Sequence, residues 1–411
     1  MIDVKAARNA PDDWRSALAR KGADAAFDAF LEVDRAWLDL VPRVDDLRSQ
    51  TKIKGKPTPE QIEALKGVKA ELQQTEADLA RAEAARQAAL DQIPNPPDPS
   101  APDGDTDEDA VEVKRVGEPP TFGFEVRDHV DLGVPAGWLD MERATRLSGS
   151  RFAYRMGDFA LAELALYRMA ITRLAGHGFT PVLTPMLVRE EAMYGTGFFP
   201  TDEVNIYGIE RDNLYLVGTS EVALAGLHMN EILDETELPR RYAGYSSCFR
   251  REAGAAGKDT RGMFRVHQFD KVEMFVFCAP EESLETHEQL LSHEEELTEA
   301  LEIPYRVVNV AAGDLGSSAT KKYDIEAWFP HQERYREITS TSNTTDFQAR
   351  RLGARFRRGK KVEPMHTLNG TAATARALLA VVENHQQEDG SVRMPTALVE
   401  NGAPEILHAS T

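Results

Sequence analysis

The densest group of potentially reactive side chains lies near the middle of the chain, at residues 249–273. Arg250, Arg251 and Glu252 precede a glycine-rich basic loop, and a strand-like run follows it and reaches Glu273. Guanidinium groups bind phosphates and carboxylates through paired hydrogen bonds, and glycine lets a backbone approach a ligand closely. The stretch therefore predicts an anion-binding site or an ordinary hairpin with a charged tip, and its own residues do not separate the two.

Further polar segments follow a recognisable order along the chain. They are Gly178-Phe179 with Pro185, Val217-Gly-Thr219-Ser220-Glu221, Glu337-Ile338-Thr339-Ser340, and Leu368-Asn369-Gly370-Thr371 through Arg376. Together with residues 249–273 they resemble the ordered motifs of the class II seryl-tRNA synthetases, over nearly the whole chain. The resemblance implies a ligase that activates L-serine with ATP to seryl-adenylate and transfers the seryl group to tRNA(Ser). Selenocysteine tRNA is a second acceptor that the resemblance allows.

The resemblance also implies an ATP site and two catalytic residues. Arg250 would hold the α-phosphate and the substrate carboxylate, and Arg376 would cover the adenine and reach the γ-phosphate. The other expected ATP-binding residues are Arg251, Glu252, Val266, Phe269, Glu337, Ile338, Thr339 and Ser340. Among them, Glu252 would read the adenine amino group and Phe269 would stack on the ring. Glu337 and Ser340 would also hold Mg²⁺ on the triphosphate, because hard cations prefer oxygen ligands. Taken singly, these residues are also compatible with ion pairs, core packing or polar strand ends.

The serine site implied by the resemblance draws on several segments. Its expected residues are Thr219, Ser220, Glu221, Arg250, Glu273 and Thr371. Glu273 with Thr371 would bind the serine hydroxyl, and a site built to hydrogen-bond a hydroxyl rejects amino acids that lack it. Thr219 with Glu221 would bind the α-amino group. His267 lies among strand residues, which favours a hydrogen-bonded structural histidine over a general base.

One segment departs from the family pattern. The stretch from Asn369 to Arg376 is one residue shorter than the family usually carries. One residue rotates a helix by about 100°, so either the preceding segment absorbs the change or Arg376 points elsewhere. This departure keeps a non-catalytic tRNA-binding paralogue open as the alternative function. A ligase that loads amino acids onto carrier proteins is a further rival, and the N-terminal region argues against it.

That N-terminal region has the spacing of two long helices. The first series of apolar residues is Phe30, Val33, Trp37, Leu40, Val44 and Leu47, and the second is Leu65, Val68, Leu72, Thr75, Leu79, Ala82 and Ala89. Steps of three and four keep one stripe along a helix. The breakers between the series, at residues 54–59, favour a reversal. The pattern predicts an antiparallel helical hairpin over about 27–93, similar to the family's tRNA-binding arm.

The bend of this hairpin is basic. Its positive residues are Arg48, Lys52, Lys54 and Lys56, and no acid lies among them. Such a run is often only a solvated turn, whereas local Lys and Arg are also what binds nucleic-acid phosphates. The resemblance favours the second reading, so these four are the predicted tRNA-binding residues. A second basic group at 350–361 is either a solvated strand pair or a surface for the tRNA acceptor end.

A proline-rich, acidic segment follows the hairpin and predicts a domain boundary. We expect an N-terminal tRNA-binding domain at 1–104 and a catalytic domain at 105–411. In the second, strand-like runs at 215–217, 242–249, 264–277 and 305–310 alternate with helical patterns at 159–174 and 375–385. This predicts an α+β fold with an antiparallel sheet. The resemblance adds a homodimer, with segment 178–185 at its interface.

Composition sets further limits. The 411 residues are 42% apolar and 28% charged, with a net charge of -20, so RNA binding must depend on local basic residues. No apolar run approaches the roughly 20 residues that cross a bilayer, and the first residues lack a secretory h-region, so we expect no membrane association and a cytoplasmic location. Cys248 and Cys278 have no nearby cysteine or histidine, which predicts buried thiols rather than zinc ligands.

Overall fold

The computed structural model describes residues 1–52, 58–254, 257 and 259–409. The chain divides into two compact units, Met1–Pro96 and Pro97–Thr411. The division falls inside the proline-rich segment, where proline ends helices because it lacks an N–H donor. Each unit has its own buried side chains and is described by itself.

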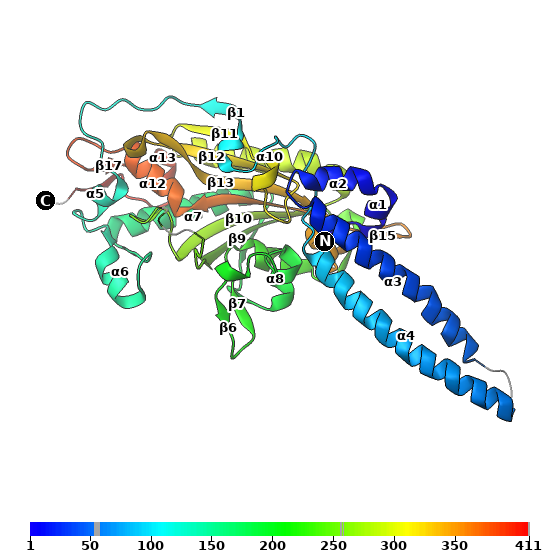
Figure 1. Ribbon diagram of the computed structural model, residues 1–411. Coiled ribbons are helices and arrows are strands. Elements are labelled where there is room, and N and C mark those ends of the chain that lie inside the picture. Colours follow the sequence, from blue (N-terminus) through cyan, green and yellow to red (C-terminus); the bar gives the residue numbers. More distant parts are fainter. Residues whose placement is uncertain (53–57, 255–256, 258, 410–411) are drawn as a thin grey trace. The chain divides into compact units, whose positions relative to one another are not determined.

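Unit 1 consists of helices. They are α1 (Val4–Asn9), α2 (Pro11–Ala19), α3 (Asp24–Gln50) and α4 (Pro59–Asp91). Helices α3 and α4 run side by side as an antiparallel hairpin (Figure 1). Phe30, Val44 and Leu47 of the predicted stripe are buried. Thr58 starts α4, because its hydroxyl accepts from the Gln61 N–H while the Gln61 side chain accepts from the Thr58 N–H. The predicted hairpin is confirmed.

A buried carboxylate ties three helices of unit 1 together. The Asp34 side chain on α3 is 3% exposed and accepts hydrogen bonds from Arg8 Nε and Arg86 Nε, each at 2.6 Å. The Arg86 guanidinium also lies 4.7 Å from the centroid of the Trp37 ring. Burial alone would raise the pKa of Asp34, but the two arginines outweigh it and hold that pKa below its usual value.

Unit 2 is built on one large sheet. Its strands, in spatial order, are β1 (Val111–Val116), β11 (Tyr305–Asn309), β12 (Lys321–Phe329), β13 (Arg334–Thr345), β16 (His366–Thr374), β10 (Gln268–Cys278), β9 (Arg240–Phe249) and β4 (Thr180–Leu183). All neighbouring pairs are antiparallel except β4 with β9. The central strands β13, β16, β10 and β9 carry the segments with the candidate chemistry. The predicted α+β fold with an antiparallel sheet is confirmed.

Helices cover the sheet, and short strands form small separate sheets. The helices are α5 (His129–Gly133), α6 (Met141–Ser148), α7 (Gly157–Gly176), α8 (Glu190–Thr196), α9 (Glu221–Ala225), α10 (Ser283–Glu299), α11 (Phe347–Leu352), α12 (Ala375–Asn384) and α13 (Thr396–Glu400). Small sheets join β2 (Leu139–Asp140) to β3 (Tyr154–Arg155), β5 (Leu187–Val188) and β6 (Gly208–Ile209) to β7 (Leu214–Leu216), β8 (Ile232–Asp234) and β15 (Lys361–Pro364) to β14 (Arg355–Arg358), and β17 (Val392–Arg393) to β18 (Ile406–Leu407). Single 3-10 turns are η1 (Asp107–Asp109), η2 (Glu203–Asn205), η3 (Gly226–His228), η4 (Glu235–Glu237), η5 (Pro280–Glu282), η6 (Ala312–Asp314) and η7 (Pro330–Gln332).

The predicted elements of unit 2 match with one exception. The runs at 242–249 and 305–310 fall on β9 and β11, and the helical patterns at 159–174 and 375–385 fall on α7 and α12. The run at 264–277 was expected to be strand throughout, but β10 begins only at Gln268. The difference arises because the backbone before it bonds elsewhere: the His267 N–H donates to the Arg151 carbonyl at 3.0 Å.

Two further expectations concern the core and the membrane. Cys248 and Cys278 are buried free thiols in β9 and β10, as predicted, and burial raises the pKa of Cys278 to about 12. Within the described ranges, none of the helices combines the length and the apolar composition of a membrane span.

Candidate active site

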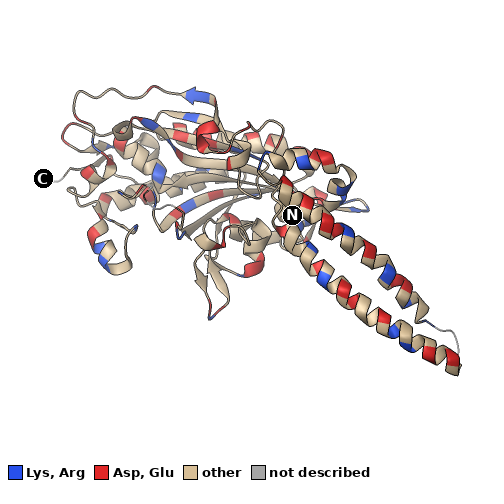
Figure 2. Cartoon of the chain, in the orientation of Figure 1, with Lys and Arg blue, Asp and Glu red and all other residues tan. Residues whose placement is uncertain are grey.

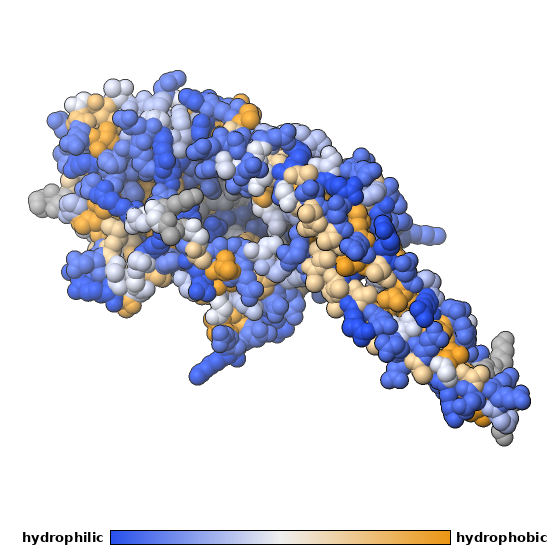
Figure 3. Space-filling model, in the orientation of Figure 1, coloured by the Kyte–Doolittle hydropathy of each residue, from blue (hydrophilic) through white to orange (hydrophobic). Residues whose placement is uncertain are grey.

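Two cavities open over the central strands of unit 2. The first, of about 330 Å³, is lined by eight of the expected ATP-binding residues, namely Arg250, Glu252, Val266, Phe269, Glu337, Ile338, Ser340 and Arg376. The second, of about 350 Å³, is lined by Thr219, Glu221, Arg250 and Thr371 of the expected serine-binding set. Figure 3 shows a hollow in the surface of this unit with mainly hydrophilic residues around its mouth.

The two cavities adjoin, because they share part of their lining. Arg250, Lys271, Lys322, Ser340 and Thr371 line both of them. Three of the five are cations, so the region common to both cavities is suited to anions. A molecule in one cavity would face a molecule in the other across this basic region.

Arg250 occupies the centre of that region. It follows β9 directly, and its N–H donates to the His267 carbonyl at 2.9 Å, which closes the base of the β9–β10 loop. Its Nε donates to the Gly218 carbonyl at 3.0 Å, and its guanidinium carbon lies 5.3 Å from the centroid of the Phe269 ring. Among the described residues Arg250 forms no ion pair, so its charge is free to meet an anionic ligand.

His267 has a structural role at the same place. Its Nδ1 lies 2.9 Å from the Arg250 carbonyl oxygen, and its ring packs against Phe152. The ring therefore orients the backbone that carries Arg250, as the sequence led us to expect. Nearby, Glu252 has a φ of 52°, a left-handed conformation that is uncommon for residues other than glycine. An ion pair with Arg265 at 2.6 Å holds its carboxylate in the first cavity.

Arg376 reaches the first cavity despite the shorter segment before it. Strand β16 ends at Thr374 and α12 begins at Ala375, so Arg376 is the second residue of the helix. Its Nε donates to the Phe264 carbonyl at 3.1 Å, and its guanidinium carbon lies 4.6 Å from the centroid of the Phe264 ring. The segment from Asn369 to Thr374 is extended strand that turns directly into the helix, and in this arrangement the Arg376 side chain lines the first cavity.

A bulge brings the expected magnesium ligands to one side of β13. Along β12, Ile325 pairs with Thr339 while Glu326 pairs with Glu337, which leaves Ile338 as an extra residue. Side chains normally alternate between the two faces of a strand, and a bulge interrupts that alternation. Glu337 and Ser340, three positions apart, therefore both line the first cavity.

Cations around Glu337 control its charge. Burial would raise the pKa of Glu337, but Arg376, Lys322, Arg250 and Lys271 outweigh burial and hold that pKa below its usual value. Arg376 is the nearest, with its NH1 3.5 Å from Glu337 Oε2. The carboxylate is therefore ionised at neutral pH and offers oxygen donors to a cation.

Glu273, one of the expected serine-binding residues, lines neither cavity and lies beneath the second, where it contacts Thr219 and Lys271 of the lining. Its side chain is 1% exposed, contacts the Lys271 ammonium, and accepts from Thr219 Oγ1 at 3.5 Å. Lys271 Nζ also donates to Thr219 Oγ1 at 3.1 Å. Burial raises the pKa of Glu273, and Lys271 opposes that rise. These three residues form one hydrogen-bonded group at the floor of the cavity.

Glu221 begins α9 and is held by amide groups. Its Oε1 accepts from Gln348 Nε2 at 2.7 Å and from Asn369 Nδ2 at 2.9 Å. Burial, together with the neighbouring Glu273 carboxylate, raises the pKa of Glu221 to about 7. An acid that titrates near neutral pH inside a cavity is a typical feature of a functional site.

Comparison with known proteins identifies the family. Residues 1–97 match the family described as "Seryl-tRNA synthetase N-terminal domain", and residues 206–385 match "tRNA synthetase class II core domain (G, H, P, S and T)". A serine--tRNA ligase of Rhodococcus jostii is 48% identical over 417 aligned positions, covering 99% of this chain and 100% of the relative. The chain belongs to the seryl-tRNA synthetase family.

Solved structures of seryl-tRNA synthetases share the fold. The enzyme of Pyrococcus horikoshii, complexed with ATP, superposes with a TM-score of 0.94 at 39% identity over 100% of both chains. The cytoplasmic enzyme of Naegleria fowleri, in complex with AMP, gives a TM-score of 0.89 at 34% identity over 98% of this chain and 96% of that one. The family resemblance inferred from the motifs is confirmed, as is membership of the class II ligases.

Some residues of this chain that were expected to bind ligands lie outside both cavities. Arg251 is exposed, and its N–H donates to the Asn205 carbonyl. Ser220 is buried and donates to the Gly244 carbonyl at 3.5 Å. Thr339 is also buried, on the opposite side of β13 from Ser340. Their expected roles would have to be exerted through the backbone or through neighbours.

The expected tRNA-binding residues are only partly described. Lys54 and Lys56 lie outside the described residues. Lys52 is exposed, and Arg48 forms an ion pair with Glu76 across the hairpin at 2.9 Å. Figure 2 shows cations and acids interspersed along both hairpin helices. In the group at 350–361, cations likewise pair with acids, for example Arg358 with Glu235 at 2.7 Å.

Sequence reasoning missed several residues of the site. Lys322 lines both cavities, and Phe264 lies under the guanidinium groups of Arg376 and Arg336 at 4.6 and 3.8 Å. Gln348 and Asn369 hold Glu221. Lys322 lies in no recognised motif, and Gln348 lies in the segment that follows Glu337–Ser340, for which the resemblance implied no ligand contact. Asn369 and Phe264 were within recognised motifs, but only the three-dimensional contacts give them a role.

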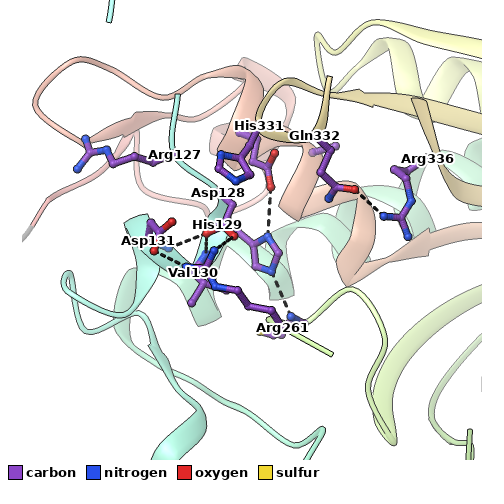
Figure 4. Close-up of polar contacts among 12 residues, drawn as sticks. Arg127, Asp128, His129, Val130, Asp131, Arg261, His331, Gln332 and Arg336 are labelled. Atoms are coloured by element: carbon purple, nitrogen blue, oxygen red, sulfur yellow. Dashed lines mark hydrogen bonds and ion pairs between the residues drawn. The ribbon is translucent and has the colours of Figure 1, made fainter. Parts of the chain in front are cut away.

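His129 is a further residue that the sequence did not single out. Figure 4 shows how it anchors the returning limb of the β9–β10 loop. Its Nε2 accepts from the Met263 N–H at 3.1 Å and its Nδ1 faces Glu383 at 3.2 Å, while Arg261 pairs with Asp128 at 2.6 Å. Gly262 has a φ of +78°, and a Cβ there would lie 2.2 Å from His129 Nε2, so only glycine fits. A separation of more than a hundred residues hides this contact from any local pattern.

Proposed function

We propose that this chain activates L-serine with ATP to seryl-adenylate, releases pyrophosphate, and transfers the seryl group to the terminal ribose of tRNA(Ser). The observation that carries the proposal is the pair of adjoining cavities with Arg250 at their junction. The first cavity has the features of a nucleotide site and the second those of an amino acid site. The family membership is consistent with both assignments.

In the first step a serine carboxylate oxygen attacks the α-phosphorus of ATP, and the bond from that phosphorus to the pyrophosphate oxygen breaks. Arg250 would bind both the carboxylate and the α-phosphate, which aligns the reacting atoms and stabilises the charge that develops on phosphorus. Phe269 would stack on the adenine, with Arg376 on its other face. Glu252 would accept from the adenine amino group.

In the second step a hydroxyl of the terminal tRNA ribose attacks the seryl carbonyl, and AMP leaves with the former carboxylate oxygen. The chemistry requires the serine to remain fixed between the steps. Thr219 and Glu221 would hold its α-amino group, and Glu273 with Thr371 its hydroxyl. Alanine has no hydroxyl and would leave the buried Glu273 carboxylate without that hydrogen-bond donor, which is unfavourable. The site would discriminate serine from alanine in this way.

Magnesium fits the first cavity. Glu337 and Ser340 offer hard oxygen donors, and the lowered pKa of Glu337 keeps its carboxylate ionised at neutral pH. Mg²⁺ held there with ATP would neutralise charge on the triphosphate. Ser340 also lines the second cavity, so this part of β13 would lie next to both ATP and serine.

Unit 1 would bind tRNA(Ser) through the hairpin of α3 and α4. We propose a tRNA-binding domain at 1–104 and a catalytic domain at 105–411, with a boundary eight residues beyond the division between the compact units at Pro96 and Pro97. A hairpin surface with local cations contacts RNA through its shape and phosphates rather than through base edges. A chain without residues 30–93 is expected to form adenylate but not to charge tRNA. If that chain still charges tRNA(Ser), the arm has no essential role; the same assay with selenocysteine tRNA tests that second acceptor.

The chain would work as a homodimer. Leu161 and Leu164 of α7 are exposed, and Leu183 of the sheet-edge strand β4 is 81% exposed. Apolar residues on an unpaired sheet edge favour association with another chain. Light scattering is expected to give twice the 45.6 kDa of one chain, and Leu183→Glu should shift the molecules toward monomer. Since tRNA and ATP are its proposed substrates, we place the enzyme in the cytoplasm.

The deciding experiment is serine-dependent exchange of pyrophosphate into ATP by the full-length protein with Mg²⁺. Serine should support exchange, while threonine, alanine and cysteine should support little. No tRNA is needed, so the result isolates the activation step. Folded protein that binds ATP yet shows no exchange would instead favour the non-catalytic paralogue.

A further inference from the structure

Three side chains that could bind a metal ion, two histidines and one glutamate, lie close together and away from both cavities. His177 directly follows the end of α7, while His293 and Glu296 lie on successive turns of α10. One ligand atom from each residue can be chosen so that all three lie within 4.8 Å of one another. None of the three lines either cavity. We propose that His177, His293 and Glu296 bind a borderline divalent cation of the Zn²⁺ type that joins the end of α7 to α10.

The chemistry of the ligand set favours this class of ion. Imidazole nitrogen with one carboxylate suits zinc and similar transition metals, whereas magnesium and calcium prefer oxygen donors alone. Two histidines and one glutamate form a three-ligand zinc site, with water as the fourth ligand. The site therefore differs from the magnesium position proposed at Glu337 and Ser340.

The geometry is close to what such an ion needs. His177 Nε2 lies 2.7 Å from Glu296 Oε2, and the His177 and His293 ring centroids are 4.5 Å apart. Ligand atoms around tetrahedral zinc lie about 3.4 Å apart, given bonds of about 2.0–2.2 Å. Binding an ion would require the 2.7 Å contact between His177 Nε2 and Glu296 Oε2 to open to that spacing. His177 and Glu296 are each about two-fifths exposed, so an ion can enter from solvent.

The end of α7 supplies negative potential at the site. His177 is the residue at the C-terminal end of α7, where the helix dipole places partial negative charge. Two cations oppose the site: Arg173 lies 3.4 Å from Glu296 Oε1, and Arg241 interacts with His293. The remaining Glu296 oxygen faces His177 and is the one available to the ion.

A bound ion would act on the fold rather than on the reaction. Helices α7 and α10 both pack against β10 and β16; α7 also packs against β9 and β4, and α10 against β12 and β13. A bridge between the two helices would therefore fasten together two elements that rest on the same central strands. Metal that binds the folded state but not the unfolded state raises stability by mass action.

Cobalt titration of the full-length chain tests this site. The protein carries no affinity tag and no ATP or Mg²⁺ is added, so that other ligands do not compete. We expect one Co²⁺ per chain with visible d–d absorption, displacement of that ion by Zn²⁺, and a rise in Tm with Zn²⁺. His177→Gln and His293→Gln should each weaken the affinity by at least about 10-fold, since even indirect partners of metal ligands contribute that much.

The matched control is His228→Gln. His228 pairs with Glu231 at 2.8 Å, and within the described ranges no third ligand completes that pair. Its affinity for Co²⁺ should equal that of the unmodified chain. Equal affinity in the His177→Gln and His293→Gln chains, or the lack of saturable binding by the unmodified chain, would overturn the proposal. His177 is exposed, so its substitution keeps the test valid should His293→Gln not fold. Pyrophosphate exchange is measured separately, so the metal site and the proposed function can fail independently.

Discussion

Two carboxylates, buried Asp34 in unit 1 and partly buried Glu221 in unit 2, show opposite ways of placing an acid inside a protein. Asp34 in the helical hairpin receives two guanidinium groups, which hold its pKa below the usual value. Glu221 in the second cavity receives two neutral amides and faces another carboxylate, and its pKa rises to about 7. The charge of Asp34 is thus neutralised by residues of the fold itself, whereas the charge of Glu221 is left for a ligand to neutralise.

The difference separates structural from functional burial of charge. A buried charge with internal partners fixes the packing of the helices that supply them. A buried acid with only partial compensation is unfavourable until a cation arrives, and the ammonium group of an amino acid is such a cation. The same contrast distinguishes Arg250, which has no ion pair among the described residues, from Arg86, which pairs with Asp34. Perturbed charge in a cavity therefore indicates ligand binding more reliably than charge alone.

The largest effect is expected where the guanidinium group of Arg250, at the junction of the two cavities, is replaced. Arg250→Lys keeps the positive charge but loses the planar fork that would bind phosphate and carboxylate together. Serine-dependent pyrophosphate exchange should fall by about 10³-fold, the loss typical of a group that stabilises transition-state charge. The Tm should change little, because Arg250 makes few internal contacts.

Arg115→Lys is the matched control for that change. Arg115 lies on β1 and pairs with Glu112 at 2.7 Å on the surface, so exchange activity should be retained. A ten-fold or smaller loss in Arg250→Lys would mean that Arg250 does not contact the reacting phosphate.

The paired acid in unit 1 should give the converse result, a loss of stability without a loss of chemistry. Asp34→Asn leaves Arg8 and Arg86 beside a neutral amide. Breaking a buried pair destabilises by about 3–5 kcal/mol, and the partial exposure of the two arginines reduces this to about 2 kcal/mol. Hydrogen exchange of α3 amides measures the change, while pyrophosphate exchange should be unaltered because none of the described residues of unit 1 lines either of the two cavities.

Acid provides the second half of this test. Since the folded-state pKa of Asp34 is lowered, its stabilisation is complete above the ordinary carboxyl pKa of about 4 and disappears as the pH falls through the folded value. The Asn variant should lack this part of the acid sensitivity of unit 1. If both chains lose α3 protection in parallel, Asp34 does not hold the helices together.

Glu221 should respond to pH in the opposite range. With its pKa raised to about 7, it loses charge as the pH falls from 8 to 6, and the KM for serine should rise by up to about ten-fold per pH unit below 7. Glu221→Gln should raise that KM about 10–100-fold, the value of a hydrogen bond to a charged group, and make it independent of pH. The KM for ATP serves as the internal control and should not change. A serine KM that stays constant from pH 8 to 6 in the unmodified enzyme would contradict this role.

The direction in which the free energy of unfolding changes with pH also differs between the two acids. Because the folded pKa of Glu221 lies above its unfolded value, the folded state binds the extra proton. The free energy of unfolding without ligand should therefore decrease as the pH rises from about 4 through 7. Serine should offset part of that decrease by neutralising the carboxylate.

Sequence alone predicted what depends on local pattern. The hairpin followed from the spacing of Phe30, Val44 and Leu47, and the sheet from short β-rich runs. The cavities bring together residues of motifs that the sequence could order but not place. What it missed depends on distant contacts: His129 with Met263, Gln348 with Glu221, and the bulge at Ile338 that turns Glu337 toward the cavity. No spacing rule contains that information.

The smallest effects are expected on the hairpin surface, where charges are paired but solvated. Arg48 pairs with Glu76 at 2.9 Å while both side chains remain largely exposed, so the pair contributes at most about 1 kcal/mol to stability. If Arg48 contacts a tRNA phosphate, Arg48→Gln should raise the KM for tRNA about two- to three-fold and reduce the slope of log K against log salt by about one. Glu76→Gln should act in the opposite direction, because it releases Arg48 from its internal partner. Opposite changes in the two variants would show that this pair competes with RNA, whereas equal or absent changes would make Arg48 a structural partner, like Arg86, and leave phosphate binding to other residues.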